Sequence, residues 1–195
     1  MLKVENRLFF ILAFSMALVV ALSNYLVQFP VKYFELENLL TYGAFSYPIA
    51  FFITDLSNRR YGKIKAKKIV YIGFALGVIM TLYFSTNFLD LISVRIAIGS
   101  GFAFLVAQLI DVNIFNVLRK KKWFIAPLTS SFVGSIIDTF LFFSIAFYGT
   151  GINWISLSIG DFIVKIIIAL IMLIPFKILI KYIREVTKIE EKASV

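Results

Sequence analysis

The sequence lacks cysteine and histidine, and only 16% of its 195 residues are charged. Without cysteine there is no disulfide framework, and without either residue type most metal sites are excluded, so we expect neither a metal ion nor another cofactor. Hydrophobic residues make up 61% of the chain, whereas soluble domains contain about 45–50% apolar and about 25% charged residues. The chain therefore lacks the polar residues that would cover a water-facing surface, and a membrane protein is predicted.

Six apolar segments approach the length needed to cross a membrane, which is about 20 residues for a hydrocarbon core of roughly 30 Å. They span residues 8–29, 42–56, 69–87, 94–118, 124–148 and 155–180. The second segment is short and contains Pro48. We predict an all-α integral membrane protein in which residues 1–195 form a single domain of six transmembrane helices.

Basic residues fall in alternate loops of this predicted arrangement. They precede the first helix and follow the second, fourth and sixth: Lys3 and Arg7; Arg59, Arg60, Lys63, Lys65, Lys67 and Lys68; Arg119, Lys120, Lys121 and Lys122; Lys181, Arg184, Lys188 and Lys192. Because Lys and Arg are retained on the cytoplasmic side in short loops, both termini are predicted to be cytoplasmic. Topology thus explains the formal net charge of +9, and no nucleic-acid partner is expected.

Apart from Lys177, which can snorkel from the cytoplasmic end of the last helix, six ionisable residues lie inside the predicted helices, where each is costly unless it is paired or hydrated. They are Asp55, Arg95, Asp111, Asp138, Asp161 and Lys165. Asp55 and Asp111 lie near the cytoplasmic ends, and we assign them a structural or gating role in which they pair with the basic loops. The other four lie in the central or outer part of the membrane and sum to zero charge. We expect them to converge on one pocket that is reachable from outside.

Local spacing places two of these charges more closely. Asp161 and Lys165 are four residues apart, so they share one helix face and can neutralise each other. Upstream, Ser131, Gly134 and Ser135 precede Asp138 with the spacing of a single helical stripe. This polar stripe is predicted to form a cavity wall.

Uncharged polar and aromatic residues of the first, second and fourth predicted helices complete the candidate site. They are Asn24, Gln28, Tyr42, Phe45, Tyr47 and Gln108. Carboxylates and amides can meet the edge of a planar, nitrogen-rich solute while aromatic rings stack on its face. A binding site for a small planar molecule is therefore predicted.

A resemblance to a known family extends over nearly the whole chain. It is carried by SNYLVQFP (23–30), TYGAFSYPIAFFITDL (41–56), RIAIGSGFAF (95–104), QLIDVNIFNVLRK (108–120), APLTSSFVGSIIDTFLFFSIAF (126–147) and the D-x-x-x-K of Asp161 and Lys165. In order and spacing these segments resemble the vitamin uptake transporter family of prokaryotes, whose best-known members transport queuosine precursors. Arg59 departs from the family pattern, because members often carry an acidic residue at that position.

The resemblance implies uptake of 7-cyano-7-deazaguanine or 7-aminomethyl-7-deazaguanine across the prokaryotic inner membrane. It also implies a six-helix fold similar to the substrate-binding subunits of energy-coupling-factor transporters. A deazaguanine has two adjacent N–H donors, which a carboxylate can accept, and a flat ring for stacking. Asp138 or Asp161 is the expected acceptor. The residues expected at the substrate are Asn24, Gln28, Tyr42, Phe45, Tyr47, Arg95, Gln108, Asp138, Asp161 and Lys165.

Three classes of function follow from these features. A carrier is favoured. It would either work without a partner protein, as a monomer or a homodimer, and be proton-linked through an aspartate, or it would be a substrate-binding subunit that needs a separate ATPase. The sequence contains no G-x-x-x-x-G-K-[ST] motif, so another chain would have to hydrolyse ATP. An enzyme would be limited to Asp, Lys and Ser, and no motif singles them out, so we predict that the protein is not an enzyme. A scaffold would not need so many buried charges.

Overall fold

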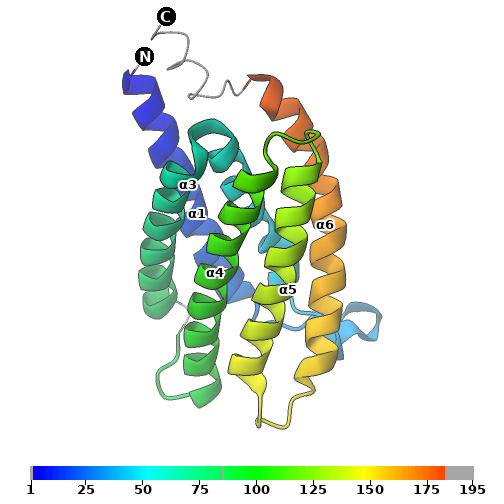
Figure 1. The fold of residues 1–195 in the computed structure, drawn as a ribbon. Coiled ribbons are helices and arrows are strands. Elements are labelled where there is room, and N and C mark those ends of the chain that lie inside the picture. The colour runs from blue at the N-terminus through cyan, green and yellow to red at the C-terminus, as the bar shows by residue number, and fades with distance from the viewer. Residues whose placement is uncertain (1, 85, 183–195) are drawn as a thin grey trace, which may run out of the picture.

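The computed structural model describes residues 2–84 and 86–182. Its elements are α1 (Leu2–Leu26), the 3-10 helix η1 (Tyr33–Asn38), α2 (Gly43–Ser46), α3 (Pro48–Phe84), α4 (Leu91–Leu118), α5 (Ile125–Phe147) and α6 (Trp154–Tyr182). The long helices lie side by side in a bundle (Figure 1). Within these described ranges no β-strand forms, and a single bridge joins Pro30 to Thr41. The described chain is therefore all-helical.

Helix α3 reverses its direction at Gly62, where φ is 79° and ψ is 175°. Glycine tolerates this positive φ because it has no Cβ. Two hydrogen bonds from neighbouring residues of α1 reveal the reversal: Ser23 bonds Ser46 over 2.8 Å, and Asn24 donates to Thr81 over 2.9 Å. The start of α3 and its end therefore lie at the same level of the bundle, and the two halves, 48–61 and 63–84, form a hairpin (Figure 1).

Among the described residues, five helical stretches are long and apolar enough to cross a membrane. They are Arg7–Leu26, Gly43–Phe84, Leu91–Leu118, Ile125–Phe147 and Trp154–Tyr182. The second is 42 residues long and contains Gly62, so it covers most of the two predicted segments 42–56 and 69–87. The difference from the expected six arises because the chain turns back at one glycine without a separate loop.

The two largest of the apolar cores in the described chain hold most of the bundle together. One lies between α1, α3 and α4 and includes Met16, Val70 and Phe104. The other lies mainly between α4, α5 and α6 and includes Ile96, Phe143, Ala146 and Leu157. Polar side chains between these cores are consequently held in a dry interior.

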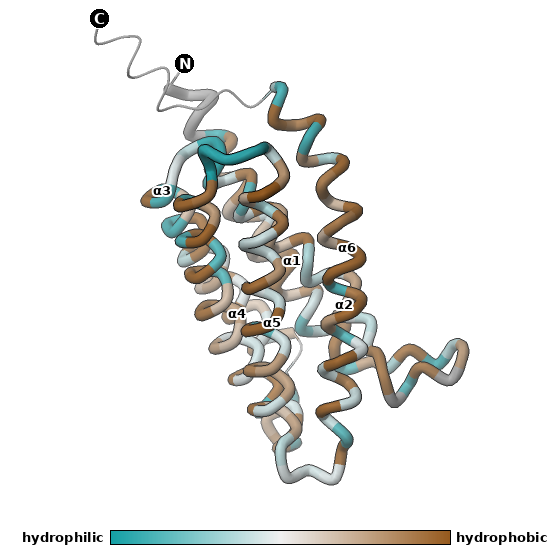
Figure 2. The backbone as a smooth tube through the Cα atoms, turned by 45° about the vertical axis from the view of Figure 1, so that its right-hand side comes forward, coloured by the Kyte–Doolittle hydropathy of each residue, from teal (hydrophilic) through white to brown (hydrophobic). Residues whose placement is uncertain are grey.

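The outer surface of the bundle is strongly apolar. Along α6 one isoleucine stripe is exposed, comprising Ile155, Ile159, Ile163, Ile167, Ile171, Ile174 and Ile178, and the same helix is largely hydrophobic along its length (Figure 2). Such a stripe would be unfavourable in water and suits a hydrocarbon environment. The surface indicates a multi-pass membrane protein.

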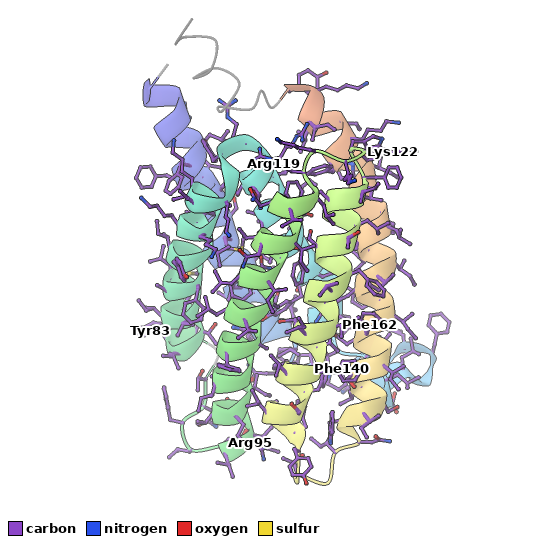
Figure 3. The ribbon with its side chains drawn as sticks, viewed as in Figure 1. Tyr83, Arg95, Arg119, Lys122, Phe140 and Phe162 are labelled. Carbon is purple, nitrogen blue, oxygen red and sulfur yellow. The ribbon has the colours of Figure 1, made fainter. Side chains whose placement is uncertain are left out.

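Basic side chains gather at one end of the bundle. Arg119 and Lys122 lie at the end where α1 begins and α6 ends, whereas Arg95 lies at the opposite end (Figure 3). The reversal of α3 at Gly62 occurs at the basic end too (Figure 1). Of the basic residues used to predict the orientation, Arg184, Lys188 and Lys192 and the side chain of Lys3 lie outside the described part.

Candidate functional site

A buried ion cluster joins α5 to α6. The ammonium group of Lys165 lies 2.8 Å from Oδ2 of Asp138 and 2.6 Å from Oδ2 of Asp161. All three side chains are buried, with exposures of 2%, 1% and 3% respectively. The structure thus brings together three of the four charges that were expected to converge, and the predicted face-sharing pair in α6 lies at their centre.

Thr139 completes the coordination of the lysine. Lys165 Nζ donates to Thr139 Oγ1 over 3.0 Å, and Thr139 in turn donates to Asp161 Oδ2 over 2.8 Å. The ring of Tyr47 lies 4.9 Å from Nζ and adds a cation–π contact. An ammonium group has three hydrogens to donate, and here it has three oxygen partners. The cluster is therefore a fixed structure with a formal charge of −1 when both carboxylates are ionised.

A small cavity lies beside this cluster and is lined by residues of α1, α2, α5 and α6 together with the α2–α3 junction. The lining residues are Asn24, Val27, Gly43, Tyr47, Asp138, Phe142, Asp161 and Lys165. We call it the central cavity. Its wall therefore combines charged, amide and aromatic groups.

Two acceptor oxygens of the central cavity have no hydrogen-bond partner within the described chain: Asp138 Oδ1 and Asn24 Oδ1. The other oxygen of Asp138 is engaged by Lys165, and the amide nitrogen of Asn24 donates to Thr81. Buried polar atoms are rarely left unpaired in folded proteins. A ligand that brings N–H donors to this wall would satisfy both oxygens.

A second small cavity lies between α3, α5 and α6. We call it the lateral cavity. Its polar lining consists of Asp55, Ser131 and Ser135, and the rest of its wall is apolar. Asp55 accepts hydrogen bonds from Ser130 over 3.1 Å and from Ser131 over 3.3 Å. The serine stripe of α5 thus leads from this cavity to Asp138 in the central one.

The expected pairing of Asp55 and Asp111 with the basic loops is wrong for the part of the chain that is described. Asp55 is bound by serine hydroxyls, and both oxygens of the fully buried Asp111 lack a hydrogen-bond partner there. Arg59 and Arg119 instead donate to each other's backbone carbonyls over 3.2 and 3.3 Å. The arginines therefore tie the basic end of α3 to that of α4, because helix-end carbonyls need donors.

Arg95 does not join the central cluster. Its guanidinium donates to the carbonyl of Ile145 over 2.9 and 2.7 Å and to that of Tyr148 over 2.8 Å. These carbonyls belong to the last turn of α5, which carries the negative end of the helix dipole. Arg95 thus caps α5 at the end of the bundle opposite the basic loops (Figure 3).

The other predicted binding residues separate into two groups. Asn24 and Tyr47 line the central cavity. Gln28 is exposed and donates to the carbonyl of Asn24 over 3.3 Å, while Phe45 is 46% exposed on the outside of the bundle. The remaining two lie elsewhere: Tyr42 packs against the buried cluster of Val31, Leu40 and Ala44, and the fully buried Gln108 accepts a hydrogen bond from Thr54.

Thr139 and Phe142 are site residues that the sequence interpretation missed. A signal for Thr139 exists in the short connection between α5 and α6. In two antiparallel helices joined by a short turn, residues separated from the turn by the same number of positions lie at the same level of the bundle. This places residues 138 and 139 beside residues 161 to 165. Phe142 has no comparable signal, because an apolar residue on α5 looks the same whether it lines a cavity or packs in the core.

Comparison with known proteins gives a consistent result. The family model described as "Putative vitamin uptake transporter" matches residues 41–180. The chain is 34% identical to the "Probable queuosine precursor transporter" of Haemophilus influenzae, with 88% of this chain and 85% of the relative covered. It is 32% identical to the "Queuosine precursor transporter" of Escherichia coli, with coverages of 81% and 79%. A Bacillus subtilis relative, also named "Probable queuosine precursor transporter", is 29% identical, with 73% of each chain covered.

No solved structure matches the chain. The geometry of the central and lateral cavities therefore comes from this structure alone.

Proposed function

This chain belongs to the vitamin uptake transporter family, which makes it a multi-pass membrane transporter of a small molecule, and from that premise we propose that it imports a 7-deazaguanine precursor of queuosine. The substrates proposed are 7-cyano-7-deazaguanine and 7-aminomethyl-7-deazaguanine. The names of the relatives support this substrate class. Membership of a transporter family also supports the expectation that the protein is not an enzyme.

The observation that carries the proposal is the pair of unpartnered acceptors in the central cavity. Asp138 Oδ1 and Asn24 Oδ1 both need N–H donors. The guanine-like edge of a deazaguanine presents adjacent N–H groups, and hydrogen bonds to a charged acceptor are the stronger kind. Asp138 accepts from this edge in our proposal, and Asn24 takes a further N–H.

The aromatic and charged residues of the central cavity have distinct proposed roles. Tyr47 and Phe142 offer ring faces against which the heterocycle stacks. Lys165 and Asp161 hold Asp138 in position rather than binding the base directly, because Lys165 has no hydrogen left to donate. The formal charge of −1 also favours the cationic aminomethyl group over the neutral cyano group.

The proposed arrangement in the membrane has six spans with both termini in the cytoplasm. The hairpin at Gly62 supports it, because it divides the 42-residue stretch into two antiparallel halves. The gathering of Arg119, Lys122 and the α3 turn at one end supports the orientation, since basic residues are retained on the cytoplasmic side. The membrane is the prokaryotic inner membrane, and the fold is similar to that of energy-coupling-factor binding subunits.

Transport by this chain alone, driven by the proton gradient, is the proposed mode. The buried carboxylates support it, because intramembrane acidic residues commonly form proton pathways. A homodimer and a separate ATPase partner are the alternative assemblies. An ATPase partner predicts that the purified chain binds substrate without transporting it.

The test is uptake of labelled 7-cyano-7-deazaguanine into proteoliposomes that contain only this protein. We expect uptake by the natural chain and its loss in Asp138→Asn, which keeps the side-chain shape and removes the charged acceptor. Glu37→Gln, on the exposed surface, is the matched control and is expected to transport normally. Unlabelled guanine should compete better than adenine, because adenine lacks the two adjacent N–H donors. Absence of both binding and uptake by well-folded protein would refute the substrate assignment.

A further inference from the structure

We infer that Asp55 and Asp111 form a proton-binding site separate from the central cavity, and that the proton held there couples transport to the proton gradient. The inference rests on the proposed function for its coupling role. Asp55 lies on the first half of α3 and Asp111 on α4, with exposures of 3% and 0%. Hydrogen bonds from Thr54 to Gln108 and from Asn58 to the carbonyl of Val112 join the two helices on either side of these carboxylates, which places them at the same level of the bundle.

The pair differs from an ordinary structural pair in what surrounds it. No basic side chain of the described residues forms an ion pair with either carboxylate, and both oxygens of Asp111 lack a hydrogen-bond partner there. Two ionised carboxylates in a dry interior would each pay a large desolvation cost and would also repel each other. The interior is therefore compatible with this pair only when at least one proton or another cation is bound.

Asn58 supplies an independent indication that a donor is missing. Its amide nitrogen donates 2.8 Å to the carbonyl of Val112, the residue that follows Asp111, and its Oδ1 is an unpartnered acceptor in a fully buried side chain. A protonated carboxyl group has an O–H to donate, whereas an ionised one has none. Neither Asn58 nor Asp111 lines the central or the lateral cavity. A bound proton, which needs no such space, is therefore favoured over a hydrated metal cation.

The two carboxyl groups have different roles because their surroundings differ. Asp55 lines the lateral cavity and accepts from two serines, so it is stabilised as an anion and can exchange a proton with that cavity. Asp111 is fully buried, and the Ser130 hydroxyl that faces it already donates to Asp55, so Asp111 holds the proton. Uptake forms one O–H bond on the pair, and release restores the carboxylate, so one proton moves in each cycle.

Few other charged groups face this pair. The other charged groups on the helices packed around the pair are Arg59 and Arg60 on α3, Arg119 at the end of α4, and Asp138 on α5, two turns beyond Ser131. Helix α6 contributes only apolar side chains to the lateral cavity.

Helix α5 connects the proton pair to the substrate. Ser131 and Ser135 line the lateral cavity, and Asp138, on the same helix face, lines the central one. A movement of α5 when Asp138 binds the substrate would also move the hydroxyl of Ser131 that donates to Asp55. Substrate and proton can in this way favour the same position of one helix.

The experiment separates exchange from accumulation in proteoliposomes that contain the full chain. Labelled 7-cyano-7-deazaguanine is exchanged against internal unlabelled base without a gradient, and accumulated under a gradient of one pH unit. The natural chain should accumulate the base about tenfold, the ratio that one co-transported proton supports per pH unit. Asp111→Asn should exchange at a similar rate and lose accumulation, with a final ratio of about one. Asp111→Glu, which keeps an acidic group, should restore part of the accumulation, and Glu37→Gln should leave it unchanged.

Accumulation that persists in Asp111→Asn, or that follows a sodium gradient in place of the proton gradient, would overturn the inference. A natural chain that neither binds nor exchanges the base would refute the proposed function instead. In that case infrared spectroscopy of the purified protein, without substrate, tests whether Asp111 carries a proton. A buried carboxylic-acid band that is lost in Asp111→Asn supports the site, and its absence in the natural protein refutes it.

Discussion

The central cluster and the Asp55–Asp111 pair are both buried and both acidic, yet they are built on opposite principles. Around Lys165 two carboxylates and a threonine satisfy every donor of one cation. Around Asp111 no donor of the described chain satisfies either oxygen. A cation whose donors are all satisfied can hold the wall of a binding site in place, whereas a buried carboxyl group whose oxygens are unpaired needs something to bind. The contrast separates positioning from coupling within one small bundle.

Replacement of the central cation should give the largest effect. Lys165→Met leaves Asp138 and Asp161 as two uncompensated buried charges, and we expect the free energy of unfolding to fall by about 3–5 kcal/mol. Denaturant titration in mild detergent measures it. Lys177→Met is the control, because Lys177 is exposed over the Trp123 ring. Equal stability of Lys165→Met and the natural chain would show that the cluster is not the rigid element described.

Loss of one hydroxyl beside each charged group should sharpen the contrast. Thr139→Val removes the group that bridges Lys165 and Asp161, at an expected cost of about 1–3 kcal/mol in unfolding free energy. Ser131→Ala removes one of two donors to Asp55 and leaves the bond from Ser130 in place, so it should cost less. Parallel denaturant titrations compare the two variants. A larger loss for Ser131→Ala would reverse the assignment of which group is complete.

Neutralisation of the unpartnered acid should act in the other direction. Asp111→Asn removes the cost of protonating a buried carboxyl group when the chain folds, and we expect stability to rise by roughly 1 kcal/mol. The thermal midpoint of the purified variant in detergent measures this change. A clear loss of stability would mean that the carboxyl group has a structural partner that the geometry does not reveal.

An aromatic residue outside both groups provides the smallest expected effect. Phe45 is 46% exposed on the outer surface, so Phe45→Leu should leave the dissociation constant for the base unchanged. Tyr47→Leu, inside the central cavity, should weaken binding about two- to tenfold through loss of ring contact. Equilibrium binding of the labelled base to purified protein compares them. Equal weakening in both variants would move the stacking surface away from Tyr47.

Spacing along single helices predicted several parts of this molecule. The four-residue separation of Asp161 and Lys165 predicted their contact, because the helical repeat brings such residues to one face. The same repeat predicted the stripe from Ser131 to Asp138. Ser131 and Ser135 line the lateral cavity, and Asp138 lines the central cavity. The prediction for Arg95 failed, because its depth and charge suggested the central cluster. Its actual partners are backbone carbonyls at the end of α5, and the sequence of α4 does not reveal them.

By itself the sequence determined that the chain is helical and apolar, where its basic segments lie, and which polar residues share one helix face. These properties are local, since they follow from composition and the repeat of a single helix. Only the tertiary structure decided that Asp138 meets Lys165, that Asp55 meets Ser130 and that Asp111 meets no donor in the described chain. Contacts between helices depend on how each is rotated and shifted against its neighbours, and that is settled by packing over many side chains rather than by any one segment.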